Sequence, residues 1–465
     1  MRILFLVHAF NSLAQRLYVE LAERGHDLSI EFDVNDTVTR EAVAGVRPDL
    51  ILAPFLKRAI PEDVWRATPC LVVHPGPPGD RGPSALDWAV LDGVERWGVT
   101  VLQADATFDA GPVRASAAFA MRPAAKAGLY RHEVTEAAVT AVLEALERFP
   151  AAGPVMAADA ADATAVCERP AMPQAVRAID WAGDDTAAVL RKIRSGDGVP
   201  GVRDRIAGLE VSLFDAHPES RLAGPPGTLL ARHHGAVCRA TADGAVWIGH
   251  LKARAGDRAA PTLKLPAAMV LGTAAAALPE VAGDYRDLWY EEAAGVGYLH
   301  FPFYNGAMGA AQCERLLAAW TAALRRAPRV LVLMGGEDFW SNGIHLNLIE
   351  AADSPADESW RTINAIDDVA RAVLTAGDTL TVSALSGNAG AGGVFLALAA
   401  DRVWARRGVV LNPHYKGMGN LYGSEYWTYV LPRRAGPDNA RAVTEARLPM
   451  GTPQAARLGL IDEAF

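Results

Sequence analysis

Short apolar runs alternate with amphipathic segments through the first 150 residues. Residues 3–7 (ILFLV) form a continuous apolar run, which is typical of a strand buried on both faces of a parallel sheet. Residues 12–24 then place Leu13, Leu17 and Leu21 on one side of a predicted helix. Further strands are predicted at residues 28–32, 50–53 and 70–73. This alternation predicts an α/β fold with a doubly wound sheet, whose ligands bind beyond the carboxyl ends of the strands.

A second series of strands and helices is predicted in the last third of the chain. Its predicted strands lie within residues 296–308, 330–334 and 380–385, and its predicted helices span residues 311–326 and 362–375. The glycine-rich residues 387–393 follow and lead into a further helix at 394–400. Such a loop presents backbone N–H groups to an anion or a polarised carbonyl. No Gly-Lys-Ser/Thr follows it, so the loop is not a Walker A nucleotide site.

Residues 411–434 (LNPHYKGMGNLYGSEYWTYVLPRR) combine aromatic, acidic and glycine residues in an unusual density. Tyr415, Tyr422, Tyr426 and Trp427 accompany Glu425, and a buried carboxylate or phenol needs a polar partner. Ser424 is predicted to cap a helix whose first turn contains Glu425. On this stretch alone, an aromatic interface and a catalytic pocket are both compatible with the pattern.

Composition narrows the class of protein. The chain has 465 residues, 51% of them hydrophobic, which is enough for two or three domains. The net charge is −9 without a Lys/Arg-rich run, which argues against a nucleic-acid partner. The four cysteines form no CxxC pair, so we expect no metal site and no disulfide framework, and a cytoplasmic location. No apolar run is long enough to span a membrane, so no membrane partner is expected.

The loop after residues 70–73 carries the first candidate site. His74 stands at the end of this predicted strand and precedes a Gly/Pro-rich loop, and an imidazole there can move protons near neutral pH. Asp109, in a second tight loop, is a candidate to orient His74 or a water molecule. A histidine that only caps its loop is the alternative interpretation.

These segments resemble the formyltetrahydrofolate-dependent formyltransferases over most of residues 1–150. That family's catalytic His and Asp fall on His74 and Asp109, whereas its catalytic Asn falls on Val72, so one polar group is missing. The resemblance implies that residues 55–61 help to hold the folate. The residues that it implies contact the folate are Phe55, Gly79, Arg81 and Gln103.

The middle of the chain is similar to the C-terminal domain of the same formyltransferases, which is a small OB-like β-barrel. Residues 209–213 alternate as a strand should, and residues 246–248 would close the barrel. The nearly balanced charge of this segment is unlike a surface that follows a phosphate backbone. The alanine-rich residues 151–165 are interpreted as a linker.

Residues 288–465 resemble the crotonase (enoyl-CoA hydratase/isomerase) family through SNGIHL and GNAGAGGVFLALAADRVWA. The two backbone amides of that family's oxyanion hole fall on Ile344 and Gly392. The resemblance also implies CoA contacts at Asn342, Gly343 and Gly393. The family's two acid/base glutamates would fall near Phe395 and His414, so hydration of an enoyl-CoA is not expected. Tyr415 and Glu425 are the candidate catalytic side chains instead.

The two-part order, together with HPGPPGDRGPSALDWA and the Tyr/Glu stretch, resembles the HypX/HoxX family of hydrogenase maturation factors. The resemblance implies transfer of the formyl group of 10-formyltetrahydrofolate to coenzyme A, followed by release of CO from formyl-CoA for [NiFe]-hydrogenase. The hydrogenase maturation machinery is the implied protein partner. Two alternatives are an amine or sugar formyltransferase fused to an acyl-CoA-binding domain, and a scaffold without activity.

The expected domains follow from these resemblances. Residues 1–165 are the predicted formyltransferase N-terminal domain, 166–268 its OB-like domain, and 269–465 a crotonase-like domain that is expected to lack that family's C-terminal helices.

Overall fold

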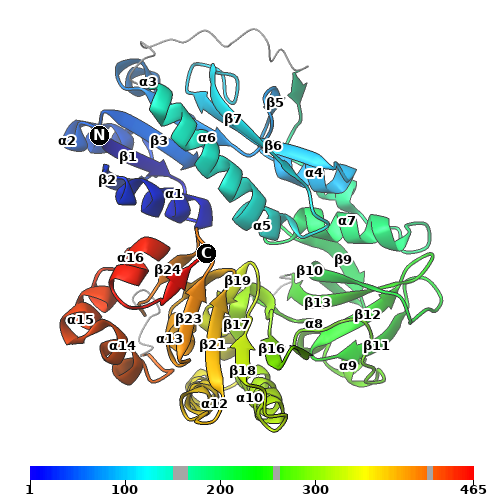
Figure 1. Cartoon of the computed structure of the whole chain (residues 1–465). Coiled ribbons are helices and arrows are strands. Elements are labelled where there is room, and N and C mark those ends of the chain that lie inside the picture. Colours follow the sequence, from blue (N-terminus) through cyan, green and yellow to red (C-terminus); the bar gives the residue numbers. More distant parts are fainter. Residues whose placement is uncertain (150–165, 255–261, 416–422) are drawn as a thin grey trace. The chain divides into compact units, whose positions relative to one another are not determined.

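A computed structural model describes residues 1–149, 166–254, 262–415 and 423–465 of the chain (Figure 1). These residues form two compact units, Met1–Tyr285 and Arg286–Phe465. The predicted linker at residues 151–165 lies outside the described residues, as do Lys416 and Tyr422 of the aromatic stretch.

The first unit begins with a six-stranded sheet of order β2-β1-β3-β4-β6-β7. Its strands are β1 Arg2–Val7, β2 Asp27–Phe32, β3 Leu50–Phe55, β4 Cys70–His74, β6 Arg96–Gln103 and β7 Val113–Ala120. The strands β2, β1, β3 and β4 are mutually parallel, whereas β6 and β7 are antiparallel to their neighbours. The predicted α/β class is confirmed, and the parallel part ends at β4, the strand that carries His74.

Helices cover both faces of this sheet. They are α1 Ser12–Glu23, α2 Asp36–Val46, α3 Glu62–Ala67, α4 Ala85–Asp92, α5 Lys126–Leu129, the π-helix η1 Tyr130–Val134 and α6 Thr135–Arg148. Side chains alternate between the two faces of a strand. Phe5 of β1 therefore joins an apolar cluster with α1 and α6, whereas Leu4 joins one with α3. The helix predicted at residues 12–24 thus buries its apolar side against this sheet.

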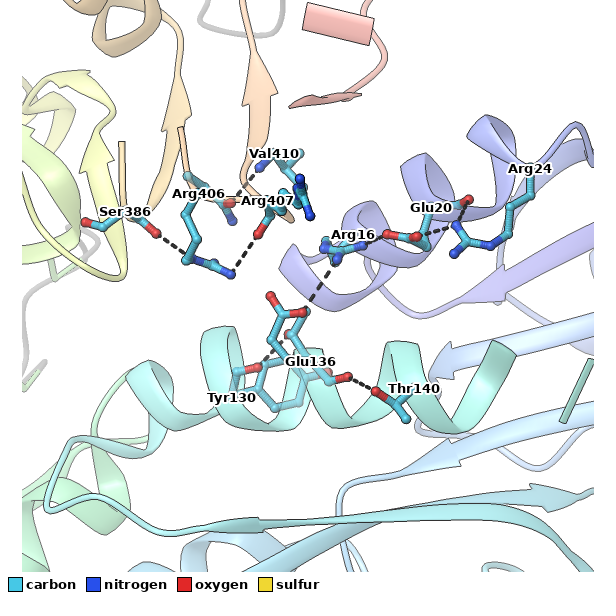
Figure 2. Close-up of polar contacts among 12 residues, drawn as sticks. Arg16, Glu20, Arg24, Tyr130, Glu136, Thr140, Ser386, Arg406, Arg407 and Val410 are labelled. Atoms are coloured by element: carbon cyan, nitrogen blue, oxygen red, sulfur yellow. Dashed lines mark hydrogen bonds and ion pairs between the residues drawn. The ribbon is translucent and has the colours of Figure 1, made fainter. Parts of the chain in front are cut away.

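A buried arginine links the two helices on one face (Figure 2). Arg16 on α1 pairs with Glu20 of the same helix and lies 3.5 Å from Glu136 on α6. Its side chain is 9% exposed, so both carboxylates neutralise a charge that would otherwise be costly to bury.

The rest of the first unit is built around an antiparallel sheet of order β11-β12-β13-β10-β9, with β14 paired to β13. Its strands are β9 Val202–Ile206, β10 Leu209–Glu219, β11 Leu229–His233, β12 Ala236–Ala240, β13 Ala245–Ala253 and β14 Lys264–Pro266. The other elements here are η3 Gln174–Arg177, α7 Thr186–Gly196, α8 Ala267–Leu271, α9 Thr273–Ala276 and the short parallel pair β5 Asp80–Arg81 and β8 Cys167–Glu168. Trp247 on β13 is fully buried, and its indole N–H donates to Glu219 at 2.6 Å. The predicted small antiparallel β domain is present.

The second unit contains a six-stranded sheet of order β15-β16-β18-β21-β23-β26. Its strands are β15 Trp289–Ala293, β16 Val296–His300, β18 Val330–Leu333, β21 Leu380–Leu385, β23 Arg402–Ala405 and β26 Glu463–Ala464. Two smaller sheets, β17-β20 and β19-β22-β24-β25, contain β17 Ala307–Met308, β19 Phe339–Ser341, β20 Gly343–Ile344, β22 Asn388–Gly390, β24 Val410–Asn412 and β25 Met450–Gly451. The helices are η4 Tyr304–Gly306, α10 Ala310–Leu324, α11 Leu346–Ala351, α12 Pro355–Leu374, α13 Gly392–Leu398, α14 Trp427–Ala435, α15 Pro437–Glu445 and α16 Thr452–Arg457.

A helix cap and an arginine that bonds two carbonyls fix the start of α12 and a loop of this unit. The helix predicted at 362–375 begins earlier because Ser354 caps it: the Ser354 hydroxyl accepts the Asp357 N–H, and Pro355 occupies the first turn. Arg406 beyond β23 donates from Nε to the Ser386 carbonyl and from Nη1 to the Arg407 carbonyl, each at 3.0 Å (Figure 2). The loop after β21 is thereby tied to the segment that follows β23.

Candidate functional site

His74 ends β4 and lies between two carboxylates. The ring is 4% exposed, its Nε2 lies 2.8 Å from Asp80 Oδ2, and its Nδ1 lies 3.6 Å from Asp109 Oδ2. The sequence prediction that Asp109 accompanies His74 therefore agrees with the geometry, although Asp80 is the closer partner and was missed.

The position of Gly76 between His74 and Asp80 is a sequence signal that Asp80 lies against the imidazole. A Cβ on Gly76 would lie 2.3 Å from Asp80 Oδ2 and 2.6 Å from His74 Nε2, so any larger residue would push the pair apart. The spacing H-P-G-x-x-x-D thus lets the loop turn back and place Asp80 against the imidazole.

Asp109 sits in a strained turn with φ +53°, a conformation that Asp adopts more readily than most residues. Its Oδ2 accepts the Gly82 N–H at 3.3 Å. Burial raises the pKa of Asp109, against the opposing effects of His74 and of the Gly82 hydrogen bond. A carboxyl in this setting can exchange a proton with its surroundings more easily than an exposed aspartate.

A pocket with an empty volume of about 480 Å³, its open mouth included, lies beside β4 and the end of β6. The residues that line it include Leu56, Ile60, Val72, Gln103 and Asp109. Part of the predicted loop 55–61 and two predicted site residues thus share one pocket.

Three other predicted folate contacts lie elsewhere. Phe55, Gly79 and Arg81 are not among the residues that line this pocket. Phe55 ends β3 and packs edge-on against His8, whereas Arg81 belongs to the short strand β5.

In the second unit, two glycine-containing segments meet in close contact. A Cβ on Gly343 of β20 would lie 3.2 Å from the Gly392 Cα and 3.4 Å from the Gly393 N. A Cβ on Gly393 would lie 2.0 Å from the Ser341 carbonyl oxygen. Side chains at these positions would separate the segments, so the backbone amides of Ile344 and Gly392 lie on neighbouring segments. Gly392 is the first residue of α13, where helical N–H groups have no partner within the helix.

Asn342 lies beside the same junction. Its Nδ2 donates to the Asn305 carbonyl at 2.8 Å. A Cβ on Gly390 would lie 2.8 Å from its Oδ1. The amide therefore ties the SNGIHL segment to the turn before β17.

Glu425 is fully buried and lies directly against Gly392. A Cβ on Gly392 would lie 2.0 Å from Glu425 Oε1 and 2.4 Å from Oε2. Oε2 accepts hydrogen bonds from the Tyr415 hydroxyl at 2.8 Å and the Ser424 hydroxyl at 2.7 Å. Oε1 has no hydrogen-bond partner among the described residues. One carboxylate oxygen is therefore held and the other faces the backbone of the glycine loop.

The prediction that Ser424 caps a helix containing Glu425 is wrong. Helix α14 begins at Trp427, and its N-cap residue is Tyr426. Glu425 precedes the helix, with a left-handed φ of +57°. The Ser424 hydroxyl is engaged by the Glu425 carboxylate rather than by a helical N–H. The Ser424 hydroxyl therefore bonds the buried Glu425 carboxylate and is not available to cap the helix.

Aromatic rings pack around Tyr415, the hydrogen-bond partner of Glu425. The Phe395 ring stacks on Tyr415 at a centroid distance of 5.2 Å, and Trp427 lies 6.3 Å away. Tyr426, which neighbours Glu425 in the sequence, is 39% exposed and does not cover it. Phe395 thus supports the Tyr415 ring from one side.

Burial dominates the electrostatics of this pair. It raises the pKa of Glu425 to about 7, an effect that the Ser424 and Tyr415 hydrogen bonds oppose and nearby Asp367 reinforces. Burial and the Glu425 charge raise the pKa of Tyr415 far above its ordinary value. The carboxyl can thus change protonation near neutral pH while the phenol keeps its proton.

None of the helices among the described residues has the length and apolar character to cross a bilayer. The His, Cys, Asp and Glu side chains of these residues include no group of three placed to hold a metal ion.

Three family models match the chain: formyl transferase over residues 31–146, formyl transferase C-terminal domain over 172–262, and enoyl-CoA hydratase/isomerase over 296–465. The hydrogenase maturation factor HoxX of Bradyrhizobium diazoefficiens is 60% identical over 467 aligned residues, which cover 100% of this chain and 82% of that relative. The chain belongs to the HypX/HoxX family of hydrogenase maturation factors.

The crystal structure of HypX from Aquifex aeolicus in complex with tetrahydrofolic acid has a TM-score of 0.96 to this HypX/HoxX chain. The two are 52% identical, and the match covers 100% of the chain and 83% of that structure. A methionyl-tRNA formyltransferase of Desulfotalea psychrophila is similar over a shorter region, with 30% identity across 41% of the chain and 62% of the relative. The predicted family, with its formyltransferase and crotonase parts, is confirmed.

Proposed function

We propose that this HypX/HoxX protein makes carbon monoxide from 10-formyltetrahydrofolate, with formyl-CoA as the intermediate, and that the CO serves hydrogenase maturation. The observation that carries the proposal is the Glu425 carboxyl, buried against Gly392 and held by Tyr415. A crotonase-like unit with this carboxyl, and without the family's glutamates at Phe395 and His414, suits removal of a formyl proton better than hydration of a double bond.

The first step takes place at His74. The CoA thiol attacks the formyl carbon of 10-formyltetrahydrofolate, and the tetrahedral centre collapses with loss of the N10–C bond. His74 accepts the thiol proton and returns it to N10, so the products are tetrahydrofolate and formyl-CoA. Asp80, 2.8 Å from Nε2, fixes the ring, and Asp109 beside Nδ1 stabilises the imidazolium that forms.

The folate is proposed to occupy the 480 Å³ pocket next to these residues. The crystal structure of the Aquifex relative contains tetrahydrofolic acid, which supports a folate ligand for the family fold. Gln103 and the loop residues Leu56 and Ile60 line the pocket and are the proposed contacts. We keep as proposed contacts Phe55, which precedes the pocket residue Leu56, and Gly79 and Arg81, which flank Asp80.

The second step takes place at Glu425, with formyl-CoA as the substrate. The Ile344 and Gly392 amides, joined through the Gly343 contact, are proposed to hold the formyl oxygen. Asn342, Gly343 and Gly393 are proposed to support the thioester beside them. The Glu425 carboxylate takes the formyl proton as the C–S bond breaks, and the CoA thiolate receives a proton from the same carboxyl. Thioester carbon thus leaves as CO and CoA leaves as the thiol, with no change of overall oxidation state.

Tyr415 is proposed to hold the carboxyl during this step. Its hydroxyl stays protonated and donates to Oε2, which leaves Oε1 to face the substrate. Burial keeps the base at a pKa of about 7, so that it can both accept and return a proton near neutral pH.

The experiment that tests the whole proposal measures CO and formylated products from the purified protein with 10-formyltetrahydrofolate and CoA. CO that depends on both substrates supports the proposal. A formylated amine or sugar without CO would support the first alternative, and no turnover of the folate would support a scaffold.

A further inference from the structure

The backbone at Glu425 takes a conformation that its sequence does not favour. Glu425 has φ +57° and Tyr426 has φ +52°, so two successive residues with side chains adopt the left-handed region. Glycine is the usual residue there, and a non-glycine pair persists only when its surroundings impose it.

Asp367 on α12 supplies that constraint. Its Oδ1 accepts the Glu425 N–H at 2.5 Å, and the backbone N–H of Tyr426 also interacts with this carboxylate. Successive N–H groups that converge on one acceptor form an anion-binding concavity, and here the anion is a side chain of the same chain. The turn before α14 is therefore anchored to the long helix α12.

This anchor determines where the Glu425 side chain goes. The left-handed turn lets the chain double back at the start of α14, so that the Glu425 carboxyl reaches Gly392. An extended or helical backbone at Glu425 would direct its side chain elsewhere. The same carboxylate that fixes the turn also places a negative charge near the Glu425 carboxyl.

We propose that Asp367 is a positioning residue for the decarbonylation site, where its carboxylate holds the Glu425–Tyr426 turn and places a negative charge beside Glu425. This inference rests on the proposed function of Glu425. Asp367 touches neither substrate nor the reacting atoms in this scheme and acts only through Glu425.

Among the described residues, the titratable groups that interact electrostatically with Glu425 include Asp367, Tyr415 and Cys313. Asp367 on α12 raises the pKa of Glu425, and the Tyr415 hydroxyl beyond β24 lowers it by hydrogen bonding. Cys313 on α10 is buried, and its thiol has a raised pKa from burial and, secondarily, from the Glu425 charge. Asp368 acts one step away, because it raises the pKa of Asp367. The Asp367 charge therefore acts directly on the Glu425 carboxyl, whereas Asp368 acts on it only through Asp367.

Two substitutions separate the two roles of Asp367. Asp367→Asn keeps an oxygen acceptor for the turn but removes the charge, so the maximal rate of CO release stays within about threefold while the acidic limb of its pH profile moves to lower pH. Asp367→Ala removes the acceptor, so the maximal rate falls by about tenfold or more because the carboxyl is displaced. Formyl transfer to CoA is unchanged in both.

Asp368→Asn is the matched control. It removes one negative charge from the neighbouring position of α12, where Asp368 pairs with Arg371 at 2.8 Å. We expect a smaller shift of the pH profile than in Asp367→Asn and no loss of maximal rate. Equal effects of the two Asn variants would overturn the proposed contact.

A readout without turnover keeps the inference distinct from the proposed function. Difference infrared spectroscopy, with Glu425→Gln as the blank, follows the protonated carboxyl band of Glu425 against pH. In Asp367→Asn, the protonated carboxyl band of Glu425 should disappear at a lower pH than in the unmodified protein. An unchanged midpoint in Asp367→Asn and an unchanged rate in Asp367→Ala would refute the role of Asp367, whereas full CO release by Glu425→Gln would refute the proposed function instead.

Discussion

The Glu425 carboxyl occupies the space that a side chain at position 392 would need. A Cβ on Gly392 would approach its Oε1, Cδ and Oε2 atoms to 2.0, 2.4 and 2.4 Å. Both residues are buried, so neither can move into solvent without disturbing the other. Glycine at this position is thus a requirement of the site rather than of the helix that it begins.

Gly392→Ala should abolish most CO release while preserving the fold. Alanine favours a helix more than glycine does, so α13 itself gains from the change. The methyl group must displace the Glu425 carboxyl, and we expect at least a tenfold fall in the rate of CO release from supplied formyl-CoA.

Gly377→Ala is its control, because a Cβ there meets nothing within 4 Å. We expect normal CO release from this variant. Normal release by Gly392→Ala as well would show that the carboxyl position is unimportant.

Asp80→Asn should slow formyl transfer, although Asp80 does not line the proposed folate pocket. The Asp80 carboxylate accepts from the His74 ring at 2.8 Å, and an amide there favours the wrong ring tautomer or a different ring orientation. We expect a fall of about tenfold or more in consumption of 10-formyltetrahydrofolate.

The comparison with Asp109→Asn shows whether both acids serve His74. CO release from supplied formyl-CoA should be unaffected in either variant. If Asp80→Asn consumes the folate at the normal rate, Asp80 is only a structural partner of the loop.

The raised pKa of Glu425 predicts a pH-dependent stability. The folded state keeps this proton up to about pH 7, whereas an unfolded glutamate loses it near its ordinary pKa of 4.5. The contribution of this protonated carboxyl to the free energy of unfolding is fully present below pH 4.5 and is lost as pH rises through about 7. It amounts to something on the order of 3 kcal/mol, since one pKa unit corresponds to about 1.4 kcal/mol.

Glu425→Gln resembles the protonated form and should therefore gain stability relative to the unmodified protein as pH rises. Urea unfolding of both proteins at pH 5 and pH 8 measures this difference. A constant difference across that range would mean that Glu425 does not titrate there in the folded state.

Much of the fold follows from local pattern. Strands at residues 3–7 and 70–73, the helix at 12–24 and the antiparallel middle segment lie close to their observed positions, because each has a clear periodicity. The start of α12 was placed too late, since its first turn is polar and is recognised only from the cap at Ser354.

The sites were harder to predict than the fold. His74 and Asp109 stand out in the sequence because one ends a predicted strand and the other lies in a tight loop, whereas Asp80 is indicated only by the spacing of the loop around Gly76. The turn at Glu425 depends on Asp367, which lies 58 residues earlier in the chain. A contact of that kind comes from packing between elements, whereas the Ser424 prediction used only neighbouring residues.

The most direct test of the account measures CO and formate from Glu425→Gln supplied with 10-formyltetrahydrofolate and CoA, beside the unmodified protein and Tyr415→Phe. Gas-phase detection follows CO, and the consumed folate reports the first step independently. The account predicts normal folate consumption by Glu425→Gln, loss of nearly all CO and accumulation of formate from hydrolysed formyl-CoA. Tyr415→Phe should show a smaller loss of CO, because it removes one hydrogen bond to the carboxyl and keeps the ring stacked on Phe395. CO release at the normal rate by Glu425→Gln would contradict the account.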